Sequence, residues 1–289
     1  MRYYSDSSTF FIRGSFRAAC SGIPEIHSVS TILSHTVPGG ASHENPEKEL
    51  EFAAAGAGIG SDFLGLLTRA PVRNFCVLQY DFITVFILAE VPGPGGETRA
   101  AMIVCSSEGL DDAALTGAIA VSVEARTDAI RASGYIPGSA PADAVIIACE
   151  GPVQHTGAGR NTEEGRRIRE VVLHGIPEAI KRSRQDDGPE RPSFFIFSRF
   201  KGEHWVEWTP ENCPYFPCHF PGQRCDFCYC PFYPCHDETL GQWVGSSNGK
   251  KVWNCAKCTL LHEPAVADYL KQYPGASLRE LVQRRKRAL

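Results

Sequence analysis

Apolar residues in the first two thirds of the chain occur in short runs separated by turn residues, a pattern typical of β-strands. Each run is rich in β-branched or aromatic residues, and the clearest cover residues 29–37, 63–68, 75–80, 83–91 and 100–107. A further run at 142–151 is almost continuously apolar, as in a strand covered on both faces. Between the start of the chain and residue 28 we expect only a short strand at 10–12 and otherwise irregular structure.

Helical periodicity alternates with these runs. Pro46 begins a predicted first helix, which ends in the glycine-rich segment 56–60. A longer helix is predicted over 110–134, with acidic residues in its first turn and a glycine at its end. Two more are expected near the C-terminus, from about Pro264 and from Ser277.

A helix after residue 160 carries its own start and stop signals. Asn161 and Glu164 have the spacing of a capping box, in which the two side chains satisfy free backbone amides. Pro177 lacks the amide that a helix interior needs, so we expect an end near Gly175 and a short restart over 177–182.

The order of these elements predicts an α/β or α+β fold, a layered domain with a mixed sheet and flanking helices. Several strands precede the first long helix, so strict alternation of strand and helix is absent. The segment 183–192 is charged and rich in turn formers, and we place the domain boundary there. The expected domains are therefore 1–185 and 186–289, and the strand-like runs SFFIFSRF and HWVEW are expected to dock onto the second.

The composition of the 289 residues is that of a folded protein, with 43% hydrophobic and 21% charged residues. The net charge of -4 argues against a protein that coats nucleic acid. The first residues lack the features of a secretory signal, and the apolar runs are too short to span a bilayer. We therefore expect a cytoplasmic location.

Eight of the 12 cysteines lie within residues 213–258, where the heptapeptide CPYFPCH returns as CPFYPCH and one CxxC pair precedes this second copy while another follows it. In a reducing compartment such a cluster is better explained by metal than by disulfides. The predicted thiolate ligands are Cys213, Cys218, Cys225, Cys228, Cys230, Cys235, Cys255 and Cys258. The small second domain is then stabilised by metal and is expected to unfold without it.

The ligands can be divided in more than one way. One division places both CxxC pairs in one site and the four repeat cysteines in another. The repeat equally allows sites that mix the two, with His219, His236 or His262 replacing a thiolate. One or two structural zinc ions are expected because four thiolates close the coordination shell, and an iron–sulfur cluster is the alternative. The remaining cysteines, Cys20, Cys76, Cys105 and Cys149, are predicted to be small core residues.

The first domain contains no GxSxG, HExxH or phosphate-loop motif, which argues against the common serine hydrolases, zincins and NTP-driven enzymes. Its candidate functional groups are polar residues at the ends of apolar strands and one acidic residue beside the apolar stripe of the long helix. They are Ser34, His35, Gly39, Gly40, Thr68, Glu124, Asp143 and His155. Each also has an ordinary interpretation as a cap, a turn residue or a buried hydrogen-bonding partner.

Residues 12–182 contain, in this order, the segments TILSHTVPGG, FLGLLT, QYDFITVFILAE, SSEGLDDAALTGAIAVSVEARTDAI, ADAVIIACEGPVQHTGAG and EEGRRIREVV. In these segments the chain resembles the CbiZ family of adenosylcobinamide amidohydrolases. The part from CPYFPCH to CAKCTLLHEPAVADYL resembles the cysteine-rich small domain that some members carry behind the hydrolase. The resemblance implies a corrinoid substrate and hydrolysis of the amide between the corrin propionate and the aminopropanol arm, giving adenosylcobyric acid for cobalamin salvage.

We assign hypothetical roles from residue type and position. Glu124 or His35 is the candidate base, and His155 the candidate donor to the leaving amine. The backbone amides of Gly39 and Gly40 are candidates for an oxyanion hole. Substrate contacts are expected from Ser34, Thr68 and Asp143 together with these glycines.

Two binding functions compete with catalysis. In one, the cysteine-rich domain and the basic end of the last helix, residues 284–287, recruit nucleic acid or a protein partner. In the other, the first domain binds a corrinoid without cleaving it. The acidic balance of the chain weighs against nucleic acid.

Overall fold

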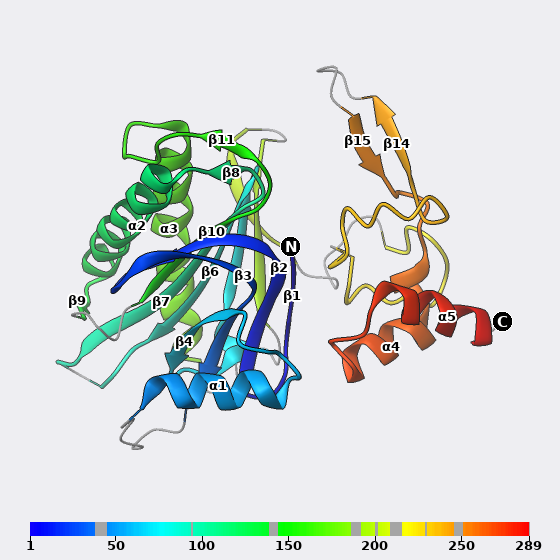
Figure 1. Cartoon of the computed structure of the whole chain (residues 1–289), viewed down its shortest axis with the longest axis horizontal. Coiled ribbons are helices and arrows are strands. Elements are labelled where there is room, and N and C mark those ends of the chain that lie inside the picture. The colour runs from blue at the N-terminus through cyan, green and yellow to red at the C-terminus, as the bar shows by residue number, and fades with distance from the viewer. Residues whose placement is uncertain are drawn as a thin grey trace. The chain divides into compact units, whose positions relative to one another are not determined.

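The computed structural model describes residues 1–37, 45–93, 95–138, 144–185, 192–199, 202–208, 216–228, 230–245 and 251–288. The chain forms two compact units (Figure 1). The larger comprises Ser5–Trp208, and the smaller comprises Thr209–Leu289 together with Met1–Tyr4.

A large mixed sheet forms the centre of the larger unit. Its strands run in the order β13-β12-β5-β6-β7-β10-β2-β3-β4. Three neighbouring pairs, β3 with β4, β7 with β10 and β5 with β12, are parallel, and the rest are antiparallel. The strands are β2 (Thr9–Cys20), β3 (Ile23–Thr36), β4 (Phe63–Thr68), β5 (Cys76–Tyr80), β6 (Ile83–Glu90), β7 (Glu97–Ser106), β10 (Val145–Cys149), β12 (Ser193–Ser198) and β13 (His204–Trp208). The expected mixed sheet is confirmed.

Three short strands lie at the ends of the large ones. β9 (Ile136–Pro137) pairs with β7, and β8 (Gly109–Leu110) pairs in parallel with β11 (Val153–His155). The pair of β8 and β11 follows directly after β7 and β10, so it extends the carboxyl ends of two central parallel strands.

The first 28 residues are more regular than expected. β2 spans twelve residues and pairs antiparallel with β3 through the turn at Gly22, which has φ 91°. The prediction of a short strand at 10–12 followed by irregular structure is therefore wrong. A bulge between Arg13 and Phe16 interrupts the alternation that the sequence pattern relies on.

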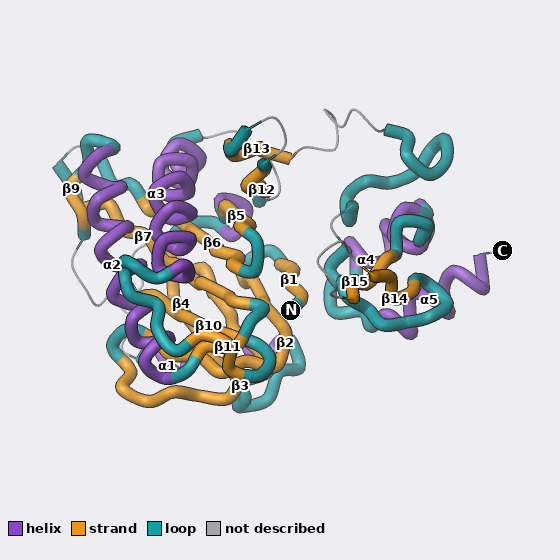
Figure 2. The backbone as a smooth tube through the Cα atoms, turned by 90° about the horizontal axis from the view of Figure 1, so that it is seen from above, coloured by secondary structure: helices purple, strands orange, loops and turns teal. Residues whose placement is uncertain are grey.

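Helices α2 (Asp112–Ala132) and α3 (Glu163–Ser183) lie side by side against β5, β6 and β10 (Figures 1 and 2). Alternate residues of β6, among them Ile83, Val85 and Ile87, are buried under this helical layer. The small residues of α2, such as Ala114 and Ala118, are fully buried and allow the helix to approach the sheet closely.

The opposite face of the sheet is buried by curvature. Phe10 of β2 lies with its ring centroid 4.4 Å from Phe75 and 5.5 Å from Phe86 of β6. Because β7 and β10 stand between β6 and β2 in the sheet, these contacts require the sheet to bend around a second apolar core. Helix α1 (Pro46–Gly56) packs on β3 and β4, with Leu50 against Gly65.

Helix α3 differs from its prediction both at its N-terminal cap and at Pro177. Its N-cap is Thr162, whose hydroxyl accepts from the amide of Gly165, so the capping box of Asn161 and Glu164 is wrong. The helix also continues through Pro177 to Ser183. Packing of α3 on α2, β5 and β6 stabilises the helical path despite the missing amide, as tertiary contacts often override local preference.

Strands β12 and β13 belong to the main sheet, where β12 pairs in parallel with β5 and with β13 at the sheet edge. They are therefore part of the larger unit. The division into units accordingly falls between Trp208 and Thr209, and not at 185/186.

The smaller unit contains β14 (Gln242–Gly245) and β15 (Lys251–Asn254), a 3₁₀ turn η3 (Leu260–His262), and helices α4 (Pro264–Gln272) and α5 (Leu278–Ala288). Strand β1 (Arg2–Ser5) begins the chain. A small core joins η3 to both helices, and its buried members are Leu260, Leu261, Val266, Leu270, Ala276 and Leu281. The two C-terminal helices begin where the sequence predicts them. Among the described residues, no helix is both long and apolar enough to cross a membrane.

Candidate functional site

His155 lies between two carboxylates contributed by different segments. Its Nε2 is 2.7 Å from Oε2 of Glu108, in the short loop between β7 and β8. Its Nδ1 forms an ion pair with Oε1 of Glu164, in the first turn of α3. The exposed fractions of the side chains of His155 and Glu164 are 16% and 9%, against 31% for Glu108. Glu164 is thus held in the interior, and Glu108 faces the open side.

Backbone and ring contacts fix this arrangement. The hydroxyl of Ser106 donates to the carbonyl oxygen of Glu108 at 2.6 Å, which closes the loop after β7. The amide of Asp111, the N-cap of α2, donates to the carbonyl oxygen of His155 at 3.0 Å. The ring of Phe82 stacks on the imidazole, with centroids 5.0 Å apart and planes 12° apart. These contacts restrict the rotation of the imidazole.

Each ring nitrogen of His155 faces a carboxylate oxygen that can accept an N–H hydrogen bond. A proton at Nε2 therefore has an acceptor, the carboxylate of Glu108, at 2.7 Å. The arrangement is suited to moving a proton at one fixed place.

Three other predicted residues lie together at a second place, the carboxyl ends of the parallel strands β3 and β4. The Nδ1 of His35 is 2.8 Å from the hydroxyl of Thr9. Thr68 accepts from the amide of Ala70 at 3.2 Å. Ser34 is fully buried, and its hydroxyl has no hydrogen-bonding partner among the described residues. Gly39, Gly40 and Asp143 lie outside the described residues.

Glu124 lies at a third place, on α2, and its surroundings differ from the apolar ones expected. Its carboxylate is 2.6 Å from Nη1 of Arg160, and Nη1 of Arg169 is 3.9 Å away. The side chain is 44% exposed. Within the described chain, no contact joins Glu124, His35 and His155, so the three candidate catalytic residues do not form one constellation.

Sequence reasoning missed the two acidic neighbours of His155. The sequence pattern pointed to Glu164 as a helix cap, and nothing in the sequence singled out Glu108. The available signal was positional: Glu108 and His155 follow the apolar runs at 100–107 and 142–151, whose parallel strands bring the segments after them together.

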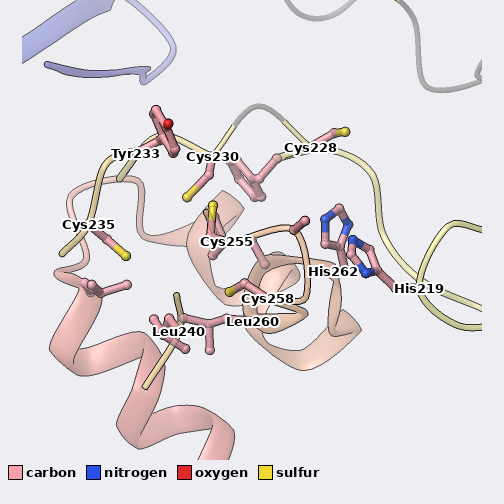
Figure 3. Close-up of a pocket in the computed structure, with 14 residues that line it drawn as sticks. His219, Cys228, Cys230, Tyr233, Cys235, Leu240, Cys255, Cys258, Leu260 and His262 are labelled. Carbon is pink, nitrogen blue, oxygen red and sulfur yellow. The ribbon is translucent and has the colours of Figure 1, made fainter. Parts of the chain in front are cut away.

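Cysteines of the smaller unit line a cavity of about 220 Å³ (Figure 3). Its lining includes Cys228, Cys230, Cys235, Cys255 and Cys258, together with His219 and His262. Burial, and then the nearby thiols of Cys255, Cys258 and Cys235, raise the pKa of Cys230 to about 11. The pKa of Cys258 is raised by burial first and by Cys235 as well.

A second group of cysteines surrounds the amide of Gln223, which is 5% exposed. Its Nε2 lies 3.4 Å from the sulfur of Cys218 and 3.2 Å from that of Cys225. Its Oε1 accepts from the backbone amide of His219 at 2.8 Å. The structure therefore brings Cys225 to Cys218, and Cys255 and Cys258 to Cys230 and Cys235.

The donor set fits a thiophilic metal ion, because thiolates and imidazoles are the ligands that zinc prefers. No three His, Cys, Asp or Glu side chains of the described part already stand in a metal-holding arrangement. Binding at the cavity would therefore require rotation of cysteine side chains. Cys213 lies outside the described residues. As predicted, Cys20, Cys76, Cys105 and Cys149 are buried and free.

Comparison with known proteins assigns both parts of the chain. A family model described as adenosylcobinamide amidohydrolase matches residues 100–188, and one described as cysteine-rich small domain matches residues 204–285. The first of these ranges contains Glu108, His155 and Glu164. No solved structure matches the chain.

Among curated proteins, an adenosylcobinamide amidohydrolase of Methanosarcina mazei is 32% identical over 197 residues, which cover 63% of this chain and 98% of the relative. An uncharacterized protein of Methanocaldococcus jannaschii is 57% identical over 56 residues, 19% of this chain and 47% of its own. A probable cobalt-factor III C(17)-methyltransferase of Methanothermobacter thermautotrophicus is 39% identical over 66 residues, 22% of this chain and 18% of its own. With nearly the whole length of the Methanosarcina protein covered, this chain belongs to the adenosylcobinamide amidohydrolase family, with a cysteine-rich small domain at its C-terminal end.

Proposed function

We propose that the protein hydrolyses the amide that joins the corrin propionate of adenosylcobinamide to its aminopropanol arm, giving adenosylcobyric acid for corrinoid salvage. The family relationship supports this substrate class. The observation that carries the chemistry is the imidazole of His155 held between Glu108 and Glu164 inside the matched segment.

In the proposed reaction the carboxylate of Glu108 accepts a proton from the attacking water, and the new C–O bond gives a tetrahedral intermediate. His155 donates its Nε2 proton to the amide nitrogen as the C–N bond breaks, which releases the amine. Glu108 then returns its proton to Nε2 across the 2.7 Å hydrogen bond. No proton is lost or gained over the cycle, and the products are the carboxylic acid and the free amine.

The difference in burial supports this division of roles. Glu164 is nearly inaccessible and lies near the N-terminus of a helix, where the helix dipole stabilises its charge. It is a positioning residue for Nδ1. Glu108 is more exposed and can turn from Nε2 toward water when a substrate approaches. Glu124 is ion-paired with Arg160 on an exposed helix surface, so we assign it no step.

We further propose that the ends of β3 and β4 contact the substrate. Ser34 offers a buried hydroxyl without a protein partner in the described part of the chain, and His35 and Thr68 lie on the same and the neighbouring strand end. A corrin ring carries many amide groups, which such donors and acceptors can bind. Gly39, Gly40 and Asp143 remain predictions for the same role.

The test is incubation of the purified full-length protein with adenosylcobinamide and identification of products by mass spectrometry. We expect adenosylcobyric acid and the free amine. His155→Asn should lower kcat by about 10²- to 10⁴-fold, the usual contribution of a general acid. Glu124→Gln serves as the control and should retain turnover within about twofold.

Absence of product, with corrinoid binding retained, would favour a corrinoid-binding protein instead. Absence of both, with nucleic-acid binding that weakens as salt is raised, would favour recruitment of nucleic acid. Normal turnover by His155→Asn would refute the assigned chemistry while leaving the substrate in place.

For the smaller unit we propose one or two structural zinc ions, held by the cysteines named above. The apolar cluster that joins η3 to the two helices has only six buried members in the described part. A metal ion would supply the cross-links that such a small core lacks.

A further inference from the structure

We infer that Cys230, Cys235, Cys255 and Cys258 hold one metal ion as a closed four-thiolate site, separate from the group around Cys218 and Cys225. The inference rests on the proposed structural metal and specifies its ligands. It joins the second CPxxPC repeat to the last CxxC pair. The two repeats therefore contribute to different groups, and so do the two CxxC pairs.

The four thiols line the same cavity from two segments of the chain (Figure 3). In the first segment, the amide of Tyr233 donates to the carbonyl oxygen of Cys230 at 3.0 Å, which forms the turn before Cys235. In the second, the amide of Cys258 donates to the carbonyl oxygen of Cys255 at 2.8 Å. This turn brings both sulfurs of the CxxC pair to one side.

A direct hydrogen bond ties the two segments together. The hydroxyl of Tyr233, within the second repeat, donates to the carbonyl oxygen of Trp253 at 3.0 Å. Trp253 is 4% exposed and lies on β15, two residues before Cys255. The repeat is thus fixed against the strand that leads into the last CxxC pair.

The surroundings of these four cysteines are apolar. Leu240, Leu260 and Leu261 line the cavity, and Cys230 and Cys258 pack against the small core. Four thiolates cannot be buried in such a place without a positive charge, because isolated buried charges are very costly. A divalent ion with tetrahedral preference offsets part of this negative charge and takes four ligands.

The remaining cysteines have a different environment. Gln223 stands between the sulfurs of Cys218 and Cys225, and neither of these two is part of the described cavity lining. Cys228 does line the cavity, yet Figure 3 shows its sulfur directed away from the other four. Cys228 also belongs to the turn of Cys225, whose carbonyl oxygen accepts from its amide at 3.2 Å.

The test is the metal content per chain of full-length protein loaded with Zn²⁺, compared across single and double cysteine variants. Cys230→Ser and Cys255→Ser should each lose one ion, and the double variant should lose no second ion, because both changes destroy the same site. Cys225→Ser should retain the ion of the inferred site.

The alternative grouping of both CxxC pairs predicts the opposite pattern. It would be supported, and ours overturned, if Cys230→Ser and Cys255→Ser lost two ions together.

Unfolding of a variant could remove all metal, so a second measurement uses the wild-type chain. Brief alkylation followed by mass spectrometry should find these four thiols protected from the reagent as a set. A chelator should make all four reactive together, and loss of protection at different chelator concentrations would overturn the inference. A chain that binds no metal would overturn the structural-metal proposal as well. None of these outcomes bears on amide hydrolysis.

Discussion

Replacement of Glu164 by Gln tests the central claim that a buried carboxylate orients His155. Gln keeps the size of the side chain and removes its negative charge, so Nδ1 contacts an amide oxygen instead of a carboxylate. A hydrogen bond to a charged group contributes about 1.5–3 kcal/mol, and a neutral one about 1 kcal/mol. Because the contact of Nε2 with Glu108 remains, we expect a loss of about 1–2 kcal/mol in the free energy of unfolding.

The effect on catalysis should exceed the effect on stability. Without the carboxylate of Glu164, the imidazole of His155 is held less firmly in the orientation that presents its Nε2 proton. We expect kcat to fall about 100-fold, the low end of the contribution of a positioned general acid. KM should change little, since Glu164 is 9% exposed and does not reach substrate. Urea unfolding measures the free energy of unfolding. Steady-state hydrolysis of adenosylcobinamide at a series of pH values measures kcat and its pH profile.

Glu163→Gln is the matched control, one residue earlier on the same helix turn. The side chain of Glu163 is 60% exposed and pairs with Arg167 at 2.5 Å. Exposed pairs contribute roughly 0.2–1 kcal/mol, so stability should fall by less than in Glu164→Gln and the pH profile of kcat should stay unchanged. The orienting role fails if both variants show equal kcat, or if Glu164→Gln leaves the pH profile unmoved while lowering stability.

The remaining predictions concern the backbone near the site, an ion pair and the metal. Gly165→Ala should destabilise the protein by about 1–3 kcal/mol, because a Cβ there would overlap the backbone oxygen of Gly159. Gly117→Ala, where the nearest atom is 3.4 Å away, should be neutral or stabilising by up to about 1 kcal/mol, and thermal unfolding of the two variants compares them. The hydrogen bond from Arg199 lowers the pKa of Asp81, so its stabilisation is present above the unfolded value near 3.9 and is lost as pH falls through the lowered pKa. Asp81→Asn should therefore lower the free energy of unfolding by about 0.5–1 kcal/mol at pH 7 and leave it unchanged in strong acid. Asn suits the φ of 52° at this position, so the backbone is not strained. Urea unfolding at both pH values is the measurement, and an equal loss of stability at both would contradict the ion pair. Removal of metal by a chelator should unfold the smaller unit and leave the sheet unit folded, which hydrogen exchange of the full chain can resolve; protection of the smaller unit after chelation would count against a structural ion.

Local features were predictable wherever one segment contains the whole signal. Pro46 and Asp111 begin helices because proline suits a first turn and an aspartate side chain accepts a backbone amide there. The apolar runs became strands within a few residues of the predicted limits. The cysteine cluster was recognisable from spacing alone, since CxxC places two thiolates within reach of one ion.

Sequence by itself therefore determined most of the strands, most helix starts, the cysteine-rich character of the second part and the family of the first. Only the tertiary structure decided which groups meet. His155 meets Glu108 and Glu164, which arrive from separate segments after parallel strands pair. Pro177 stays within a helix because packing on the sheet outweighs one missing hydrogen bond. The path of the chain in space places the cysteines in two groups. Sequence spacing alone could not decide between the possible groupings, because it only limits which thiolates can reach one ion.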